Sequence, residues 1–171
     1  NSLLQGTMPP VATFDLSDSR HYEDVENVAN LTISPTTPGG FVVPFEAPLI
    51  VELPANSPIV GAMTVGGNTA TAPVVEFTGP LTDGSVTIGT GIEIGFVGTL
   101  PAGQGIIVDT RPWSTSVKRV NGGGAPVVLS RKTRLARSLV GPGAYQAVLR
   151  GTDATGTARA QVRWRNAYTT L

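Results

Sequence analysis

The sequence predicts an all-β protein, an antiparallel β-sandwich, on three observations. Apolar and polar residues alternate with a period of two in several short runs, whereas helical spacing of apolar residues is rare. The 171 residues include 21 Gly and 14 Pro, well above their usual combined share of about 12%. These turn-forming residues recur between the alternating runs at near-regular spacing, which is typical of antiparallel sandwiches.

The first 55 residues differ from the rest and predict an extended N-terminal arm and connector. Carboxylates are frequent in its first half, and prolines and glycines in its second half. Each proline removes a backbone donor and is confined to edge strands or bulges. We therefore expect residues 1–55 to form an arm with one or two edge strands, at 30–34 and 48–53, and residues 56–171 to form the sandwich domain.

The clearest strand runs from Ala158 to Arg165, where apolar residues alternate with Arg or Gln. This pattern predicts a half-buried strand with a cationic outer face and with Trp164 in the core. The same alternation predicts strands at 92–97 and 145–150. Further strand candidates are 59–65, 73–78, 85–89, 105–110, 114–120 and 126–129.

Turn signals complete the predicted fold. Asp109-Thr110 after an apolar run and Asn121-Gly122 are typical of hairpins, because Gly and Asn tolerate a positive φ. Thr78-Gly79-Pro80 predicts the end of a strand. Only residues 130–139 break the pattern, with Leu135 and Leu139 four apart, and predict a short helical turn or ordered loop.

Composition excludes several classes of protein. The chain has no cysteine, so disulfide scaffolds, thiolate nucleophiles and Cys-type zinc sites are excluded. Its longest uncharged stretch, 53–75, contains prolines and glycines, so no continuous membrane helix is expected. No signal peptide is expected either, because the opening residues lack a basic run and a long apolar core.

The net charge of zero conceals a segregation along the chain. Residues 1–100 hold ten carboxylates and one base, whereas residues 101–171 hold eleven bases and two carboxylates. The basic half is suited to an anionic partner, or the two halves, or two copies of the chain, face each other with opposite potential. The alternative is that both sets of charges are solvated, because surface ion pairs contribute only about 0–1 kcal/mol each.

The sequence contains no strong candidate for a nucleic-acid, catalytic or metal site. Nucleic-acid binding is not expected, because aromatic residues make up only 6% of the chain and the net charge is zero. The only histidine, His21, the one candidate for an imidazole base, lies in the polar arm. Glu76 and Glu93 are the candidate pair for glycoside hydrolysis, but both alternate with apolar residues and are expected on the outer sheet face. Calcium is conceivable at the carboxylates of 15–26, although no calcium-loop motif is present, and a solvated acidic arm explains them better. We therefore predict no catalytic residue, cofactor or metal.

Five strings, taken together and in order, resemble the C-terminal half of the distal tail protein, or siphovirus-type minor tail protein, of long non-contractile-tailed bacteriophages. They are TAPVVEFTGPL (71–81), LPAGQGIIVDTR (100–111), VKRVNG (117–122), LVGPGAY (139–145) and AQVRWRNAY (160–168). The Thr36-Thr37-Pro38-Gly39-Gly40 stretch is similar to the connector that precedes that half.

The resemblance implies a galectin-like β-sandwich in the virion, at the tail tip, between the tail tube and the adhesion apparatus. In this family an N-terminal domain builds a ring around the tail channel. Because the connector-like stretch begins at residue 36, we expect that domain to be missing or mostly missing here. The partners implied are other copies of the chain, in a hexameric or trimeric ring, and adjacent tail and baseplate proteins.

The expected function is therefore structural and non-enzymatic. Trp and Arg are enriched at the energetic centres of protein interfaces, and the candidate interface residues are Arg111, Trp113, Arg131, Lys132, Arg134, Arg137, Arg159, Arg163 and Arg165. The runner-up is carbohydrate recognition of a host polysaccharide, for which Trp113 is the tryptophan expected outside the core.

Overall fold

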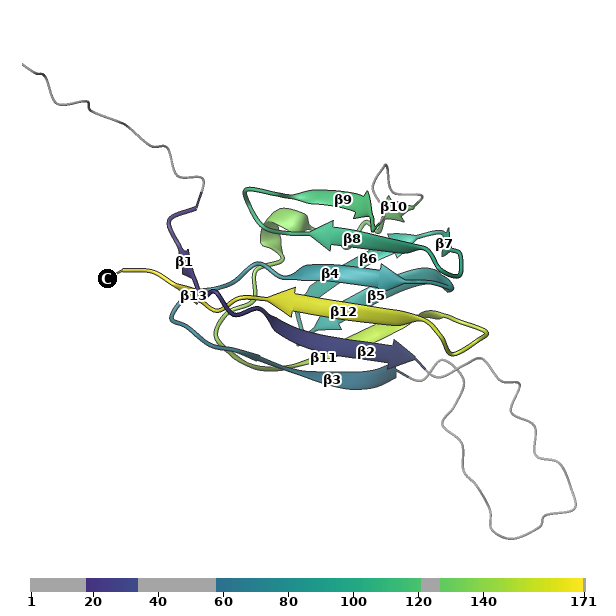
Figure 1. The fold of residues 1–171 in the computed structure, drawn as a ribbon, viewed down its shortest axis with the longest axis horizontal. Helices are drawn as coiled ribbons and strands as arrows, with labels where there is room; N and C mark the ends of the chain where they lie inside the picture. The colour runs from purple at the N-terminus through teal and green to yellow at the C-terminus, as the bar shows by residue number, and fades with distance from the viewer. Residues whose placement is uncertain (1–17, 34–57, 121–126, 171) are drawn as a thin grey trace, which may run out of the picture.

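A computed structural model describes residues 18–33, 58–120 and 127–170, which form two antiparallel layers of strands (Figure 1). The strands are, in chain order, β1 (His21–Tyr22), β2 (Asn27–Ile33), β3 (Pro58–Val65), β4 (Val74–Thr78), β5 (Leu81–Ile88), β6 (Ile92–Val97), β7 (Thr99–Leu100), β8 (Gly105–Asp109), β9 (Ser116–Arg119), β10 (Val128–Leu129), β11 (Gly143–Thr152), β12 (Arg159–Trp164) and β13 (Ala167–Tyr168). A short 3-10 helix, η1 (Leu135–Arg137), precedes β11. The predicted all-β antiparallel sandwich is confirmed.

The front layer of Figure 1 has the strand order β2-β12-β4-β8-β9, and the back layer has the order β3-β11-β5-β6-β10. The layers are joined on one side where β2 pairs with β3, at Thr32–Ile59 and Ile33–Pro58. At the other side β9 and β10 end the two layers. β1 and β13 form a separate two-stranded sheet at the left end of the view.

The core lies between the layers and is filled by the alternating residues that the sequence predicts. In β12 the side chains of Ala160, Val162 and Trp164 are at most 5% exposed, and the residues between them face outward. Phe77 of β4 and Phe96 of β6 meet edge to face with ring centroids 5.3 Å apart, so each layer contributes one ring to the same contact.

β2 corrects the prediction of an edge strand within the arm. It lies between β3 and β12 and pairs with β12 from Asn27 to Thr32. Residues 27–33 contain no proline, and Ala29, Leu31 and Ile33 alternate into the core, so nothing prevents ladder pairing on both sides. The other predicted arm strand, at 48–53, the connector-like stretch at 36–40 and the Asn121-Gly122 turn lie outside the described residues.

The turn predictions that can be checked are confirmed. β4 ends at Thr78, and η1 forms a short helical turn within 130–139. The β8–β9 hairpin follows Asp109, which pairs with Ser116. The residues between these two partners form the loop that carries Arg111 and Trp113.

Candidate binding groove

A groove opens at the end of the sandwich where β8 and β12 finish. One depression of about 260 Å³ is lined by Tyr22, Glu26, Thr71, Ala72, Val74, Arg111, Trp113, Arg163, Trp164 and Arg165. A second, of about 400 Å³, lies on the outer face of the front layer; it shares Val74, Arg111 and Arg163 with the first and adds Lys118. Because Val74, Arg111 and Arg163 border both depressions, the two are neighbours, and the surface that contains them is the end groove.

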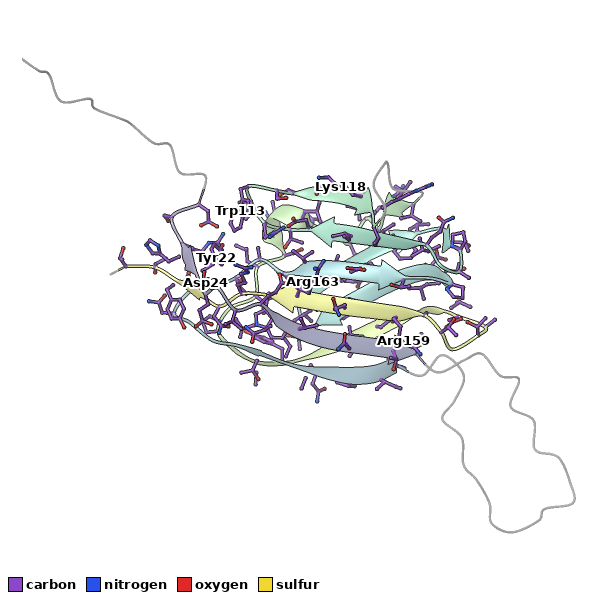
Figure 2. All side chains as sticks on the ribbon, viewed as in Figure 1. Tyr22, Asp24, Trp113, Lys118, Arg159 and Arg163 are labelled. Carbon is purple, nitrogen blue, oxygen red and sulfur yellow. The ribbon has the colours of Figure 1, made fainter. Side chains whose placement is uncertain are left out.

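Two aromatic side chains from distant parts of the sequence form its rim. Tyr22 of β1 and Trp113 of the β8–β9 loop meet with ring centroids 5.1 Å apart and ring planes at 67°. Trp113 remains 46% exposed. Figure 2 shows both residues at the same end of the molecule, with Arg163 and Lys118 further along the front layer. The rim therefore offers aromatic surface to solvent.

The carboxylate of Asp109 positions the loop on the Trp113 side. Asp109 is 5% exposed. The Nη2 of Arg111 donates to its Oδ2 at 2.6 Å, and the Nε of Arg111 donates to its Oδ1 at 2.9 Å. Burial raises the pKa of Asp109, but the donors of Arg111 outweigh burial and leave that pKa lowered. The guanidinium is thereby held with its central carbon 5.9 Å from the Trp113 ring centroid.

Asp18 positions Tyr22 in a similar way. Its Oδ2 accepts hydrogen bonds from the Tyr22 hydroxyl at 2.6 Å and from Nη2 of Arg20 at 2.8 Å. The Nη1 of Arg20 donates to the carbonyl of Ala70 at 2.7 Å, which ties this cluster to the loop between β3 and β4. Burial raises the pKa of Tyr22, and its bond to Asp18 raises it further, so the hydroxyl stays protonated at neutral pH.

The C-terminal segment closes the same end. The carboxylate of Glu23 accepts from Nδ2 of Asn166 at 2.9 Å and from the Tyr168 hydroxyl at 2.5 Å. Gly67 has φ +88, and a Cβ there would come within 2.1 Å of the Ala167 carbonyl oxygen, so this close approach requires glycine. These contacts seat β13 beside β1.

Arg163 and Trp164, which line the first depression, each have a buried donor without an acceptor among the described residues. The Nη2 of Arg163 lies 3.3 Å from Oε2 of Glu76. Among the described residues, Nε of Arg163 and Nε1 of Trp164 are buried without an acceptor. An unpaired buried donor costs about 1–3 kcal/mol.

The predicted interface residues separate into three groups. Arg111, Trp113, Arg163 and Arg165 meet in the end groove. Arg159 lies at the opposite end of β12 (Figure 2). The remaining four follow β10, and the last of them ends η1: Arg131, Lys132, Arg134 and Arg137.

Sequence reasoning missed Tyr22 and Glu26 as groove residues. Neither belongs to an alternating run, and the pairing of β1 with β13 that brings this segment beside the β12 end is long-range. A two-residue strand gives no periodic signal.

The candidate catalytic carboxylates do not meet. Glu76 belongs to β4 in the front layer and contacts Arg163, whereas Glu93 belongs to β6 in the back layer and lies 3.5 Å from Lys132. His21 is exposed on β1.

Across 18–33, 58–120 and 127–170, no three His, Cys, Asp or Glu residues are grouped so as to hold a metal ion. In the same ranges no helix has the length and apolarity needed to cross a membrane.

Folding interleaves the two oppositely charged halves of the sequence. β4, from the acidic half, lies between β12 and β8 from the basic half. Two ion pairs among the described residues join the halves, Glu76–Arg163 and Glu93–Lys132, and two are local, Asp18–Arg20 and Asp109–Arg111.

Comparison with protein-family models, curated proteins and solved structures finds no match to this chain.

Proposed function

We propose that this chain is a non-enzymatic structural protein of the virion, at the tail tip of a long-tailed bacteriophage. There it binds copies of itself, in a hexameric or trimeric ring, and the adjacent tail and baseplate proteins. The observation that carries the proposal is the spatial arrangement of the strings that resemble the distal tail family. Strings 71–81, 100–111 and 160–168 contain β4, β8 and β12, and β4 pairs with both other strands. String 139–145 is joined to the first by the Thr71–Val140 bridge.

Two surfaces support assembly with neighbours. Among the described strands, β9 and β10 end their layers, and an end strand can accept a strand from another protein at its outer backbone groups. Arg131, Arg134 and Arg137 make no ion pair with the described residues, so their charges are available to an acidic neighbour. Repetition of such contacts around a symmetry axis then stabilises a ring.

Immunogold electron microscopy tests this proposal directly. Antibodies raised against the purified chain are applied to intact particles of the phage that encodes it, and we expect gold at the tail tip. Antibody pre-absorbed with the purified chain is the control and removes the label. Label on the capsid, or particles without label whose protein content lacks the chain, contradicts the proposal.

Recognition of a host polysaccharide is the second candidate function. The specific observation that favours it is the exposed ring of Trp113 in the end groove, because lectin sites combine an exposed aromatic ring with polar side chains. The galectin-like sandwich that the family resemblance implies is compatible with this function but does not establish it. We expect the chain to be retained on host cell-wall polysaccharide and Trp113→Ala to abolish retention. Equal retention of the variant contradicts this function.

A further inference from the structure

We propose that the end groove binds an acidic saccharide, a sugar unit that carries a carboxylate. This inference rests on the second candidate function, polysaccharide binding, and is independent of assembly into a tail. It names the site and the chemical class of the ligand.

The size and the exposed groups of the groove favour a saccharide over a peptide. Its second depression, of about 400 Å³, falls within the ~300–1,000 Å³ typical of small-ligand sites, and the first, of about 260 Å³, lies just below that range. The aliphatic residues of its first depression, Ala72 and Val74, are 4% and 6% exposed, so an apolar anchor of a protein partner finds no pocket there. The exposed aliphatic residue, Val120 at 42%, borders the second depression. Trp113 offers instead a flat aromatic surface on which the C–H face of a sugar ring packs.

Hydrogen-bond chemistry points to the same class. Sugar hydroxyls donate and accept at once, so they complement a wall that holds both guanidinium donors and a carboxylate acceptor. Arg163 and Arg165 supply donors and Glu26 supplies acceptors around the first depression.

Charge selects an acidic saccharide. The carboxylate of Asp109 is already bound by Arg111. Lys118 and Arg165 are exposed and make no ion pair with the described residues. The two depressions are lined by two carboxylates, Glu26 and Asp109, and by five cations, Arg111, Lys118, Arg119, Arg163 and Arg165. A ligand carboxylate therefore meets an excess of positive charge, and charge-assisted hydrogen bonds are about twice as strong as neutral ones.

Tryptophan fluorescence provides a local measurement, because both tryptophans of the chain, Trp113 and Trp164, line the groove. The purified chain is titrated with galacturonate oligosaccharides, with neutral galactose oligosaccharides and with polyglutamate. We expect a saturable change with the galacturonate probe that weakens as salt is added, and no comparable change with the other two.

Matched variants locate the binding. Lys118→Gln and Arg165→Gln remove exposed cations without a described ion-pair partner, so folding is preserved, and each should raise the Kd for the galacturonate probe about tenfold. Arg150→Gln, an exposed residue of β11 in the back layer, should leave the Kd unchanged.

Each alternative outcome overturns the inference in a distinct way. Equal binding of the neutral probe retains polysaccharide recognition but removes the acidic requirement. Equal binding of polyglutamate assigns the groove to an acidic protein partner. The sugar site lies elsewhere if the chain is retained on host polysaccharide without any fluorescence change. It also lies elsewhere if the Lys118→Gln and Arg165→Gln variants bind like the Arg150→Gln control. Loss of binding to every probe and to host polysaccharide removes the second candidate function as well.

Discussion

Asp18 holds β1 in place through contacts that require an ionised carboxylate. Burial raises its pKa, but hydrogen bonds from Arg20 and Tyr22 outweigh burial and lower it from 3.8 to about 2. A pKa that is lower in the folded state contributes stability above the unfolded value, and this stability is lost as the pH falls through the folded value.

We therefore expect Asp18→Asn to lower the free energy of unfolding at neutral pH, with a difference from the wild type that shrinks between about pH 4 and about pH 2. Urea unfolding at a series of pH values measures this. Asp24→Asn, which alters an exposed carboxylate on the same segment (Figure 2), is the control. A deficit that stays constant across this pH range contradicts the role given to Asp18.

Individual groove residues were predicted from the sequence only in part. Arg111 and Trp113 stand out because Trp and Arg are enriched at binding sites, and the structure brings them together with Arg163 and Arg165. Tyr22 could not be found in this way. Its position depends on contacts such as that between Arg20 and the Ala70 carbonyl, fifty residues apart in the sequence.

At the level of elements, the β11–β12 hairpin depends on one buried carboxylate. Asp153 is 2% exposed. Its Oδ1 accepts from the backbone N–H of Thr155 and its Oδ2 from the backbone N–H of Ala158, both at 2.8 Å. Burial raises the pKa of Asp153, but these donors outweigh burial and lower it, so the carboxylate is ionised.

Asp153→Ala leaves these N–H groups without their acceptor, so we expect the free energy of unfolding to fall by about 1–3 kcal/mol. Chemical denaturation followed by circular dichroism measures the change. Ala154→Ser, at an exposed position of the same turn, is the control and should be nearly neutral. An Asp153→Ala variant as stable as this control contradicts the role of the carboxylate.

Strands of five or more residues were predictable because alternation marks which side chains enter the core. β12 follows this pattern at every position, whereas in β6 Ile94, Gly95 and Phe96 are buried in succession. The place of β2 between β3 and β12 was not predictable, because pairing partners are chosen by long-range packing and the prolines that follow β2 suggested an edge. β1, β7, β10 and β13 have two residues each, too few to show a period, and of these only β10 lies within a predicted strand, that at 126–129.

For the molecule as a whole, the contact between Phe77 and Phe96 couples the two layers. Phe77 is 0% exposed and Phe96 is 2% exposed. Phe77→Ala should lower the free energy of unfolding by about 3–5 kcal/mol through lost burial and a residual cavity. In a double-mutant cycle with Phe96→Leu, we expect a coupling energy of about 0.5–1.5 kcal/mol. If the effects of the two substitutions on the free energy of unfolding are additive, this pair does not couple the two layers.

The charge distribution of the whole molecule leads to a prediction about self-association. Ion pairs between the halves neutralise Arg163 and Lys132 within one copy, whereas Arg131, Arg134 and Arg137 keep their charge without an ion-pair partner among the described residues. If copies meet through opposite potential, their contact is screened by salt, since the Debye length falls from about 10 Å at 0.1 M to about 3 Å at 1 M.

We therefore expect the average mass measured by light scattering to fall toward that of the monomer as NaCl is raised between these concentrations. At low salt, the triple variant Arg131→Gln/Arg134→Gln/Arg137→Gln should have a lower mass than the wild type, because it removes cations from a single segment. Arg150→Gln, one exposed cation of the back layer, should retain the wild-type mass. A mass that is indifferent to salt would show that apolar or backbone contacts, such as strand addition at β9 or β10, hold the copies together instead.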